Sequence, residues 1–329
     1  MAAVSLSMAV AAYDHVRDLV NGRVRPEGIE LTAMELGVEE IFFRTSTFQE
    51  WDIAEFSMAK YVSMLSNGTA PFRAIPVFPS RVFRQSAFYV ATASGICSAE
   101  DLVGRRVGIP EWSQTAGIYA RAFLQHQCGV RLADIRWVQA GVNQAGRHEK
   151  VTLSLPEGIT IKAVSDRSLN EMLLAGDLDA IITAREPASF IAGDATIARL
   201  WPDYRAMEQS YYESTGIFPI MHVIVVRNEA LDGAPWVAMN LLRAFEEAKA
   251  NSLKRLSTIV NSPIAIPWSL HAYQLAQKVF GDDLWPYGLD ANRRTLDAFL
   301  QYSHEQGVTQ RRLSAEELFP HEVTKMFKV

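Results

Sequence analysis

Residues 51–57 read WDIAEFS, and a similar arrangement, GDLDAII, follows a helical segment at residues 176–182. In each stretch an aspartate precedes a short apolar run that is typical of a buried strand. Polar side chains follow at the carboxyl end of the run, Glu55 and Ser57 in the first stretch and Thr183 after the second. Open α/β sheets bind ligands at the carboxyl ends of their strands. Two such units facing each other predict a ligand cleft between two sheets.

The rest of the chain supports a two-lobed α/β fold. β-rich runs alternate with amphipathic helical segments, which predicts mixed sheets flanked by helices. A chain of 329 residues is also long for a single hydrophobic core. We predict a discontinuous lobe 1 at residues 1–95 and 216–329 and a lobe 2 at residues 96–215, with crossovers near 86–97 and 213–222.

Composition limits the kinds of ligand that the protein binds. The net charge is −5, from 32 basic and 37 acidic residues, and the charges are not gathered in long runs. A nucleic-acid surface needs a basic stripe, so we expect a small molecule and no nucleic acid as ligand. Cys97 and Cys128 are the two cysteines, which excludes a disulfide framework and a thiolate zinc site.

The amino-terminal stretch Met1–Ala12 is apolar, but no Lys or Arg precedes it and a polar turn follows it. This pattern predicts a first strand rather than a signal peptide. No apolar run approaches the ~18 residues of a membrane span. We therefore expect a cytoplasmic protein with no membrane partner, and the sequence leaves homo-oligomerisation open.

Two arginines mark a candidate binding segment, residues 78–84, which read FPSRVFR and precede an apolar run at residues 86–91. A guanidinium group presents a rigid fork of donors that matches a carboxylate. We predict that Arg81 and Arg84 bind a carboxylate of a small organic acid. Surface salt bridges are the alternative interpretation of both side chains.

Several stretches resemble one enzyme family along nearly the whole chain. They are EIFFR (40–44), AEFS (54–57), IPVFPSR (75–81), GIPE (108–111), TGIFPIMH (215–222) and WPYG (285–288), the last followed by Asn292 and Arg293. In these stretches the chain is similar to 4,5-dihydroxyphthalate decarboxylases, whose members look like type II periplasmic binding proteins. The resemblance implies two α/β lobes and a cytoplasmic carboxy-lyase that converts a dihydroxylated phthalate to 3,4-dihydroxybenzoate.

Such a reaction needs an acid, because loss of CO2 from an arene leaves a carbanion unless the ring carbon is protonated. His222 is the leading candidate, since imidazole titrates near neutral pH, although a histidine in an apolar strand is often a core residue. Glu55 is the second candidate, either as a buried acid or as the partner of an arginine. Glu111 is the third, with stabilisation by a helix dipole as the alternative.

Other side chains are candidates for substrate contacts. Hydroxyl groups are available for ligand oxygens, the first strand-to-helix turn is a frequent ligand position, and aromatic rings can stack on a flat substrate. The alternatives are helix caps for the small polar residues and core packing for the aromatic ones. The candidates are Ser57, Ser80, Ser113, Thr115, Tyr13, Asp14, Phe78 and Trp112.

No flavin, pyridoxal or nucleotide motif is present, so we expect no organic cofactor. The alternative is a divalent metal ion, which His15, Glu55 and His222 would have to bind from distant parts of the sequence. A second alternative is a solute-binding protein that uses the same cleft without catalysis, because a fold alone does not define an activity.

Overall fold

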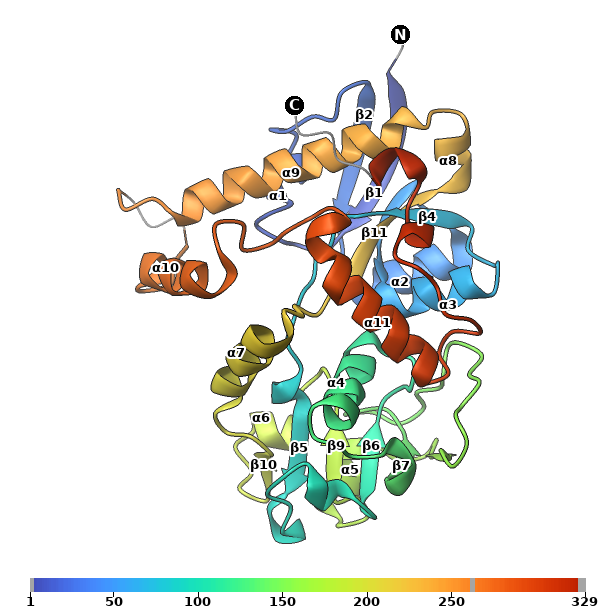
Figure 1. Cartoon of the computed structure of the whole chain (residues 1–329), viewed down its shortest axis with the longest axis vertical. Helices are drawn as coiled ribbons and strands as arrows, with labels where there is room; N and C mark the ends of the chain where they lie inside the picture. Colours follow the sequence, from blue (N-terminus) through green and yellow to red (C-terminus); the bar gives the residue numbers. More distant parts are fainter. Residues whose placement is uncertain (1–2, 261–263, 325–329) are drawn as a thin grey trace.

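The computed structural model describes residues 3–260 and 264–324, which form two lobes stacked along the long axis of the molecule (Figure 1). Each lobe contains one mixed β-sheet with helices packed around it. The predicted two-lobed α/β fold is thereby confirmed. The first two residues of the stretch Met1–Ala12 lie outside the described part of the chain.

Lobe 1 contains a five-stranded sheet in the order β2-β1-β3-β11-β4. β1 runs parallel to β2 and β3, whereas β11 is antiparallel to its neighbours β3 and β4. The strands are β1 (Val4–Val10), β2 (Ile29–Glu35), β3 (Ile53–Ser57), β4 (Phe72–Ile75) and β11 (His222–Arg227). The helices are α1 (Arg17–Val20), α2 (Val38–Phe48), α3 (Met58–Ser66), α8 (Asn228–Asp232), α9 (Trp236–Leu256), α10 (Ser269–Phe280) and α11 (Arg293–Glu305).

Lobe 2 contains a six-stranded sheet in the order β10-β5-β9-β6-β7-β8. Its strands are β5 (Phe88–Ala91), β6 (Arg106–Ile109), β7 (Arg136–Gln139), β8 (Ile161–Ala163), β9 (Ala180–Ile182) and β10 (Ile197–Arg199). Its helices are α4 (Thr115–His126), α5 (Leu169–Leu174), α6 (Ala188–Ile191) and α7 (Tyr204–Thr215). α5 begins with a capping box in which the side chains of Ser168 and Glu171 each accept a backbone N–H, as the sequence predicts.

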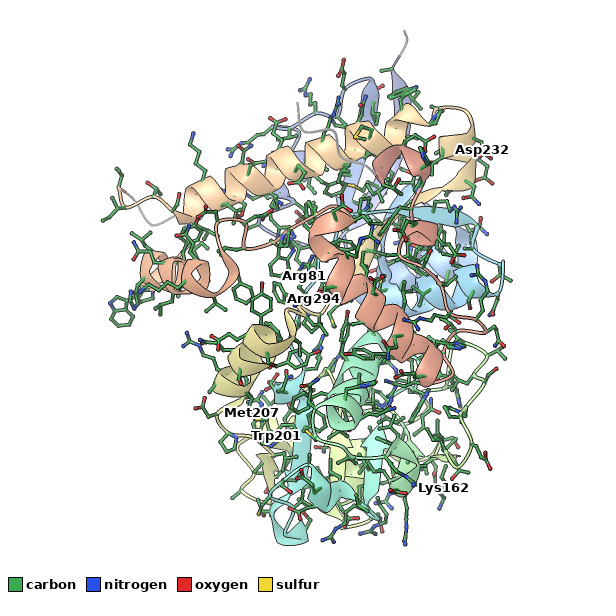
Figure 2. The ribbon with its side chains drawn as sticks, viewed as in Figure 1. Arg81, Lys162, Trp201, Met207, Asp232 and Arg294 are labelled. Atoms are coloured by element: carbon green, nitrogen blue, oxygen red, sulfur yellow. The ribbon has the colours of Figure 1, made fainter. Side chains whose placement is uncertain are left out.

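The chain crosses between the lobes twice, and the first crossing comes earlier than the sequence predicts. Phe88 already pairs with Ile182 of β9, so the chain has joined the second sheet there and the boundary at residue 95 is too late. The return follows α7, which Gly216 ends in the left-handed conformation at φ 64°. A side chain at this glycine would meet Arg294, labelled beside the crossings in Figure 2.

The return strand begins at the end of the crossover predicted near residues 213–222. β11 begins at His222, because the residues before it pair with the first crossing rather than with the sheet. Ile220 forms an isolated bridge with Arg81, and the N–H of Met221 donates to the carbonyl of Ser80 at 2.8 Å. The two crossings therefore run side by side, directly next to the carboxyl end of β3.

The two lobes share packed surface. One cluster of buried apolar side chains extends from Met8 in β1 to Trp137 in β7. α11 of lobe 1 lies against α4 of lobe 2 (Figure 1), where Gln306 accepts a hydrogen bond from Arg121 at 2.9 Å. Within residues 3–260 and 264–324, no helix has the length and apolar character needed to cross a membrane.

Candidate active site

Strand register brings three predicted site residues to one face of the lobe 1 sheet. His222, the first residue of β11, lies opposite Ser57 at the end of β3. Glu55 is two residues from Ser57 on the same strand and therefore shares its face. Glu55 and His222 are thus diagonal cross-strand neighbours, close enough for their side chains to interact.

The carboxyl group of Glu55 is fully buried and accepts three hydrogen bonds. His222 Nδ1 lies 2.6 Å from Oε1, and the Tyr13 hydroxyl donates to the same oxygen at 2.7 Å. The backbone N–H of Ala11 donates to Oε2 at 2.9 Å. An ionised carboxylate only accepts, so this set of donors favours a negatively charged Glu55.

His222 is held with its second nitrogen available. Its Nδ1 is engaged by Glu55, and Phe42 packs edge-on against the ring with centroids 4.9 Å apart. Nε2 has no hydrogen-bonding partner among the described residues, and 18% of the side chain is exposed. A carboxylate that orients an imidazole through one nitrogen leaves the other to exchange a proton with a ligand. We call these two residues the Glu55–His222 pair.

Tyr13 lies in the first strand-to-helix turn and extends this network. Burial, together with the charge of Glu55, raises the pKa of Tyr13, so the phenol stays protonated and donates to Glu55. The Ser80 side chain acts against this rise in the pKa of Tyr13. The structure therefore brings Tyr13, a predicted site residue, to the Glu55–His222 pair, with Ser80 near the Tyr13 hydroxyl.

Arg84 lies in the first crossing and contacts the residue that precedes His222. Its Nε donates to the thioether of Met221, the residue before His222, at 3.3 Å. The two terminal nitrogens have no hydrogen bond to any described residue. Burial lowers the pKa of Arg84 to about 10, against the opposing charge of Glu208. A partly desolvated guanidinium without a paired carboxylate matches the predicted carboxylate receptor.

Arg81, the second predicted receptor, is occupied by the protein itself. Its guanidinium donates to the carbonyl of Phe218 at 3.0 Å, to that of Pro286 at 2.7 Å, and to Asn292. The side chain is 4% exposed and lies over the rings of Phe78 and Phe218. Arg81, labelled at the junction of the lobes in Figure 2, therefore joins the crossings to the segment before α11. This geometry is contrary to the prediction that Arg81 binds a carboxylate of the substrate.

Glu111 lies in lobe 2 and is separated from the Glu55–His222 pair. It is buried and ion-paired with Arg147 at 2.6 Å and with Lys150 at 3.4 Å. Arg147 also contacts Glu39 of α2 at 3.5 Å, and Arg185 contacts Glu39 at 3.3 Å. Because Glu39 belongs to lobe 1, these charges form an ion-pair network between the lobes. A proton-donor role for Glu111 is not supported by this geometry.

Thr115 and Ser57 also connect the lobes. The two hydroxyl oxygens are 3.1 Å apart, and the Thr115 hydroxyl oxygen accepts the N–H of Ala59 at 3.1 Å. Thr115 begins α4 and Ala59 lies in the first turn of α3, so two helix amino termini meet here. In this closed arrangement both hydroxyls bind protein groups rather than facing a ligand.

Replacing Thr115 with Val should lower the free energy of unfolding by about 1 kcal/mol, because the buried N–H of Ala59 loses its acceptor. Urea unfolding monitored by tryptophan fluorescence measures the difference. Thr115→Ser keeps the hydroxyl and serves as the control. Equal stability of Thr115→Val and Thr115→Ser would contradict the assigned role of this contact.

The remaining predicted contacts are part of the protein framework. Ser113 binds Glu149, whose carboxylate also accepts the N–H of Trp112 at 2.7 Å. Trp112 itself is fully buried and covers the guanidinium of Arg121, so it has no free face for a substrate. Asp14 pairs with Arg255 at 3.1 Å, away from the Glu55–His222 pair. Phe78 is likewise fully buried, and the prediction that these four side chains contact substrate lacks geometric support.

Sequence reasoning missed several residues of this region. Glu149 was not predicted as a site residue, yet its carboxylate accepts backbone N–H groups of the loop before α4. Phe42 packs on His222 and lies in the stretch 40–44 that carries the family resemblance. Lys60, in the first turn of α3, has no ion pair within the described chain, and burial lowers its pKa. The spacing of charged and apolar residues in the sequence does not distinguish these three residues from ordinary surface residues.

The described residues do not gather the ligands of a metal centre. No group of three or more His, Cys, Asp or Glu side chains within residues 3–260 and 264–324 is arranged to hold a metal ion. The set His15, Glu55 and His222 therefore lacks metal-binding geometry in this conformation. A groove of about 1060 Å³ lies elsewhere, in lobe 2, and includes Lys162, which Figure 2 labels far from Arg81.

Solved structures with similar folds define the structural class. The chain superposes on the periplasmic aliphatic sulphonate binding protein SsuA from Escherichia coli with a TM-score of 0.54 and 12% identity, covering 98% of this chain and 99% of that one. The desulfurization enzyme DSZB matches with a TM-score of 0.50 and 13% identity, covering 98% and 97%. Identities this low establish the fold alone, that of a type II periplasmic-binding-protein-like molecule.

Sequence similarity defines the family. No protein-family model matches the chain. The chain is 37% identical over 330 residues to 4,5-dihydroxyphthalate decarboxylase of Comamonas testosteroni, covering 100% of both. It is 38% identical over 212 residues to the protein of the same name from Pseudomonas putida, covering 64% of this chain and 82% of that one. The chain belongs to the 4,5-dihydroxyphthalate decarboxylase family, which confirms the predicted family and the carboxy-lyase class.

Proposed function

We propose that this protein removes one carboxylate from 4,5-dihydroxyphthalate and releases CO2 and 3,4-dihydroxybenzoate. The observation that carries the proposal is the Glu55–His222 pair, with 2.6 Å between Nδ1 and Oε1 and a free Nε2. Family membership supports the choice of substrate, since both relatives bear the name of this reaction. An imidazole held in this way supplies the acid that aromatic decarboxylation requires.

In the proposed mechanism, protonated His222 delivers a proton from Nε2 to the ring carbon that bears the departing carboxylate. The bond between that carbon and the carboxylate then breaks, CO2 leaves, and the electron pair restores the aromatic ring. Glu55 keeps the ring of His222 in position throughout, as the orienting carboxylate of a catalytic triad does. A proton from solvent returns the imidazole to its starting state.

Arg84 is the group that we propose for the carboxylate that stays on the ring. Its terminal nitrogens have no hydrogen bond or ion pair among residues 3–260 and 264–324, and its Nε contacts Met221, which precedes His222. A charge-assisted pair between a guanidinium and a carboxylate is stronger than a neutral hydrogen bond and fixes the orientation of a ring. Arg84 would bind the carboxylate that remains, and His222 would protonate the ring carbon of the carboxylate that leaves. The two residues would thereby distinguish the two neighbouring carboxylates of the substrate.

We also propose that the reaction uses neither an organic cofactor nor a metal ion. The support is the Glu55–His222 pair itself, whose Nδ1 and carboxylate are already bound to each other and to Tyr13. A metal ion at this position would need to displace those contacts before it gained ligands. Protonation by an imidazole needs no Lewis acid to proceed.

The assay that tests the function mixes purified protein with 4,5-dihydroxyphthalate and follows CO2 release and the ultraviolet spectrum, with and without a chelator. We expect turnover that is insensitive to chelation. Tight binding without CO2 release would show a solute-binding protein instead. Activity that is lost on chelation and restored by one divalent ion would overturn the metal-free mechanism.

A further inference from the structure

His15 is a partly buried titratable side chain that the proposed mechanism leaves unused. It follows Tyr13 in the turn after β1, and its ring lies among three aromatic rings. The centroid of Tyr13 is 5.3 Å away, that of Trp285 is also 5.3 Å away, and that of Tyr287 is 6.4 Å away. Its Nε2 atom is buried and has no hydrogen-bonding partner in the described part of the chain.

The protonation of His15 follows from its surroundings. Burial lowers the pKa of His15 to about 4, against the opposing charges of Asp14 and Glu55, so the imidazole is neutral near pH 7. The backbone of Pro79 acts on the pKa of His15 in the same direction as these two charges. We assign the proton of the neutral ring to Nδ1, because Nε2 is buried without a partner among the described residues. Nε2 then carries a lone pair and acts as an acceptor.

A buried acceptor that has no donor is unfavourable unless another group supplies one. The hydroxyl of Tyr287, whose ring centroid lies 6.4 Å from that of His15, is also buried and without a hydrogen-bonding partner among the described residues. A phenolic hydroxyl of a ligand can both donate and accept a hydrogen bond. His15 Nε2 is therefore an acceptor to which a ligand hydroxyl can donate.

The position of His15 relative to the Glu55–His222 pair suits the substrate of the proposed reaction. Tyr13 spans the two, since its ring packs on His15 while its own hydroxyl donates to Glu55 at 2.7 Å. Tyr13 thus connects His15 to the Glu55–His222 pair. A hydroxyl para to the departing carboxylate lies at the opposite end of the substrate ring from the carbon that is protonated.

We propose that His15 Nε2 accepts a hydrogen bond from the substrate hydroxyl para to the departing carboxylate. This inference rests on the proposed function and names the group that recognises the hydroxylated end of the ring. The hydrogen bond increases electron density on the phenol oxygen and, through the ring, on the carbon that takes the proton from His222. No atom is transferred to His15, and the hydroxyl keeps its proton in the product.

Two non-reacting ligands isolate this contact. 3-Hydroxybenzoate keeps the hydroxyl that was para to the departing carboxylate, and 4-hydroxybenzoate lacks it, while both keep the remaining carboxylate. Titration calorimetry on the full chain compares wild type with His15→Phe, which retains an aromatic ring but has no acceptor. We expect His15→Phe to weaken 3-hydroxybenzoate about tenfold, as for one lost buried hydrogen bond, and to leave 4-hydroxybenzoate within about twofold.

Equal effects on both ligands, or no effect on either, would overturn the proposal. Circular dichroism verifies folding, and His15→Leu gives the same comparison if His15→Phe does not fold. Tyr287→Phe removes the neighbouring buried hydroxyl and is expected to leave the difference between the ligands intact. If Tyr287→Phe alone weakens 3-hydroxybenzoate, the acceptor assignment to His15 is wrong.

The comparison needs no turnover, so it is independent of the assay for CO2 release. A selective loss of 3-hydroxybenzoate binding in a protein that releases no CO2 would support hydroxyl recognition by His15 and contradict the proposed reaction. Turnover of 4,5-dihydroxyphthalate combined with an unselective effect of His15→Phe would contradict the inference and leave the reaction in place.

Discussion

Replacing His222 with Asn is expected to reduce kcat for 4,5-dihydroxyphthalate by roughly 10²-fold or more, with little change in KM. The asparagine amide still donates to Glu55 from the Nδ1 side, so the buried carboxylate stays paired. The proton donor at Nε2 is lost, so the substrate ring carbon is protonated more slowly, by water. Steady-state kinetics with CO2 detection separates the two parameters.

His126 offers a matched control, because its Nε2 lies 2.8 Å from Glu305 in a similar histidine–glutamate contact. That contact lies between α4 and the end of α11, away from the Glu55–His222 pair. His126→Asn should therefore leave kcat unchanged. An unchanged kcat in His222→Asn would transfer the acid role to another group and contradict the assignment.

Replacing Arg81 with Met is expected to lower the free energy of unfolding by about 3–5 kcal/mol, the usual cost of removing one partner from a buried polar network. The substitution removes the donor of the Phe218 carbonyl and of the Asn292 amide oxygen, and it leaves the Pro286 carbonyl with the Asn292 amide as its remaining donor. It also removes a cation that packs on Phe78 and Phe218. Urea unfolding followed by circular dichroism measures the change.

Arg84→Met is the matched comparison for Arg81→Met, from the same stretch of sequence. Because the terminal nitrogens of Arg84 have no partner among the described residues, its loss should cost far less stability. It should instead raise KM strongly, since the substrate carboxylate loses a charged partner worth about 2–5 kcal/mol. A stable Arg81→Met with raised KM would show that the two roles are exchanged.

Much of the fold follows from local patterns. The stretch 51–57, in which the sequence predicts a buried strand, contains β3 (Ile53–Ser57), because apolar spacing and turn residues act over short distances. The first crossing was placed too late because the apolar run at residues 86–91 indicates a strand but not its sheet. Pairing with Ile182 depends on residues far along the chain.

The candidate site was predictable only in part, for the same reason. Glu55 and His222 were each recognised as titratable residues near a cleft, but their contact depends on β11 entering between β3 and β4. Arg81 and Arg84 look alike in the sequence. They differ because Arg81 meets the carbonyls of Phe218 and Pro286, contacts that no local pattern encodes.

The position of β11 between β3 and β4 also affects the order in which the protein folds during synthesis. Glu55 leaves the ribosome long before His222, and the residues between them include the whole lobe 2 sheet. Contacts between such distant residues form late, whereas a continuous domain can fold as soon as it is made. Lobe 2 is therefore expected to be folded while the lobe 1 sheet still lacks the strand that joins β3 to β4, and the Glu55–His222 pair forms only after the last third of the chain has begun to emerge.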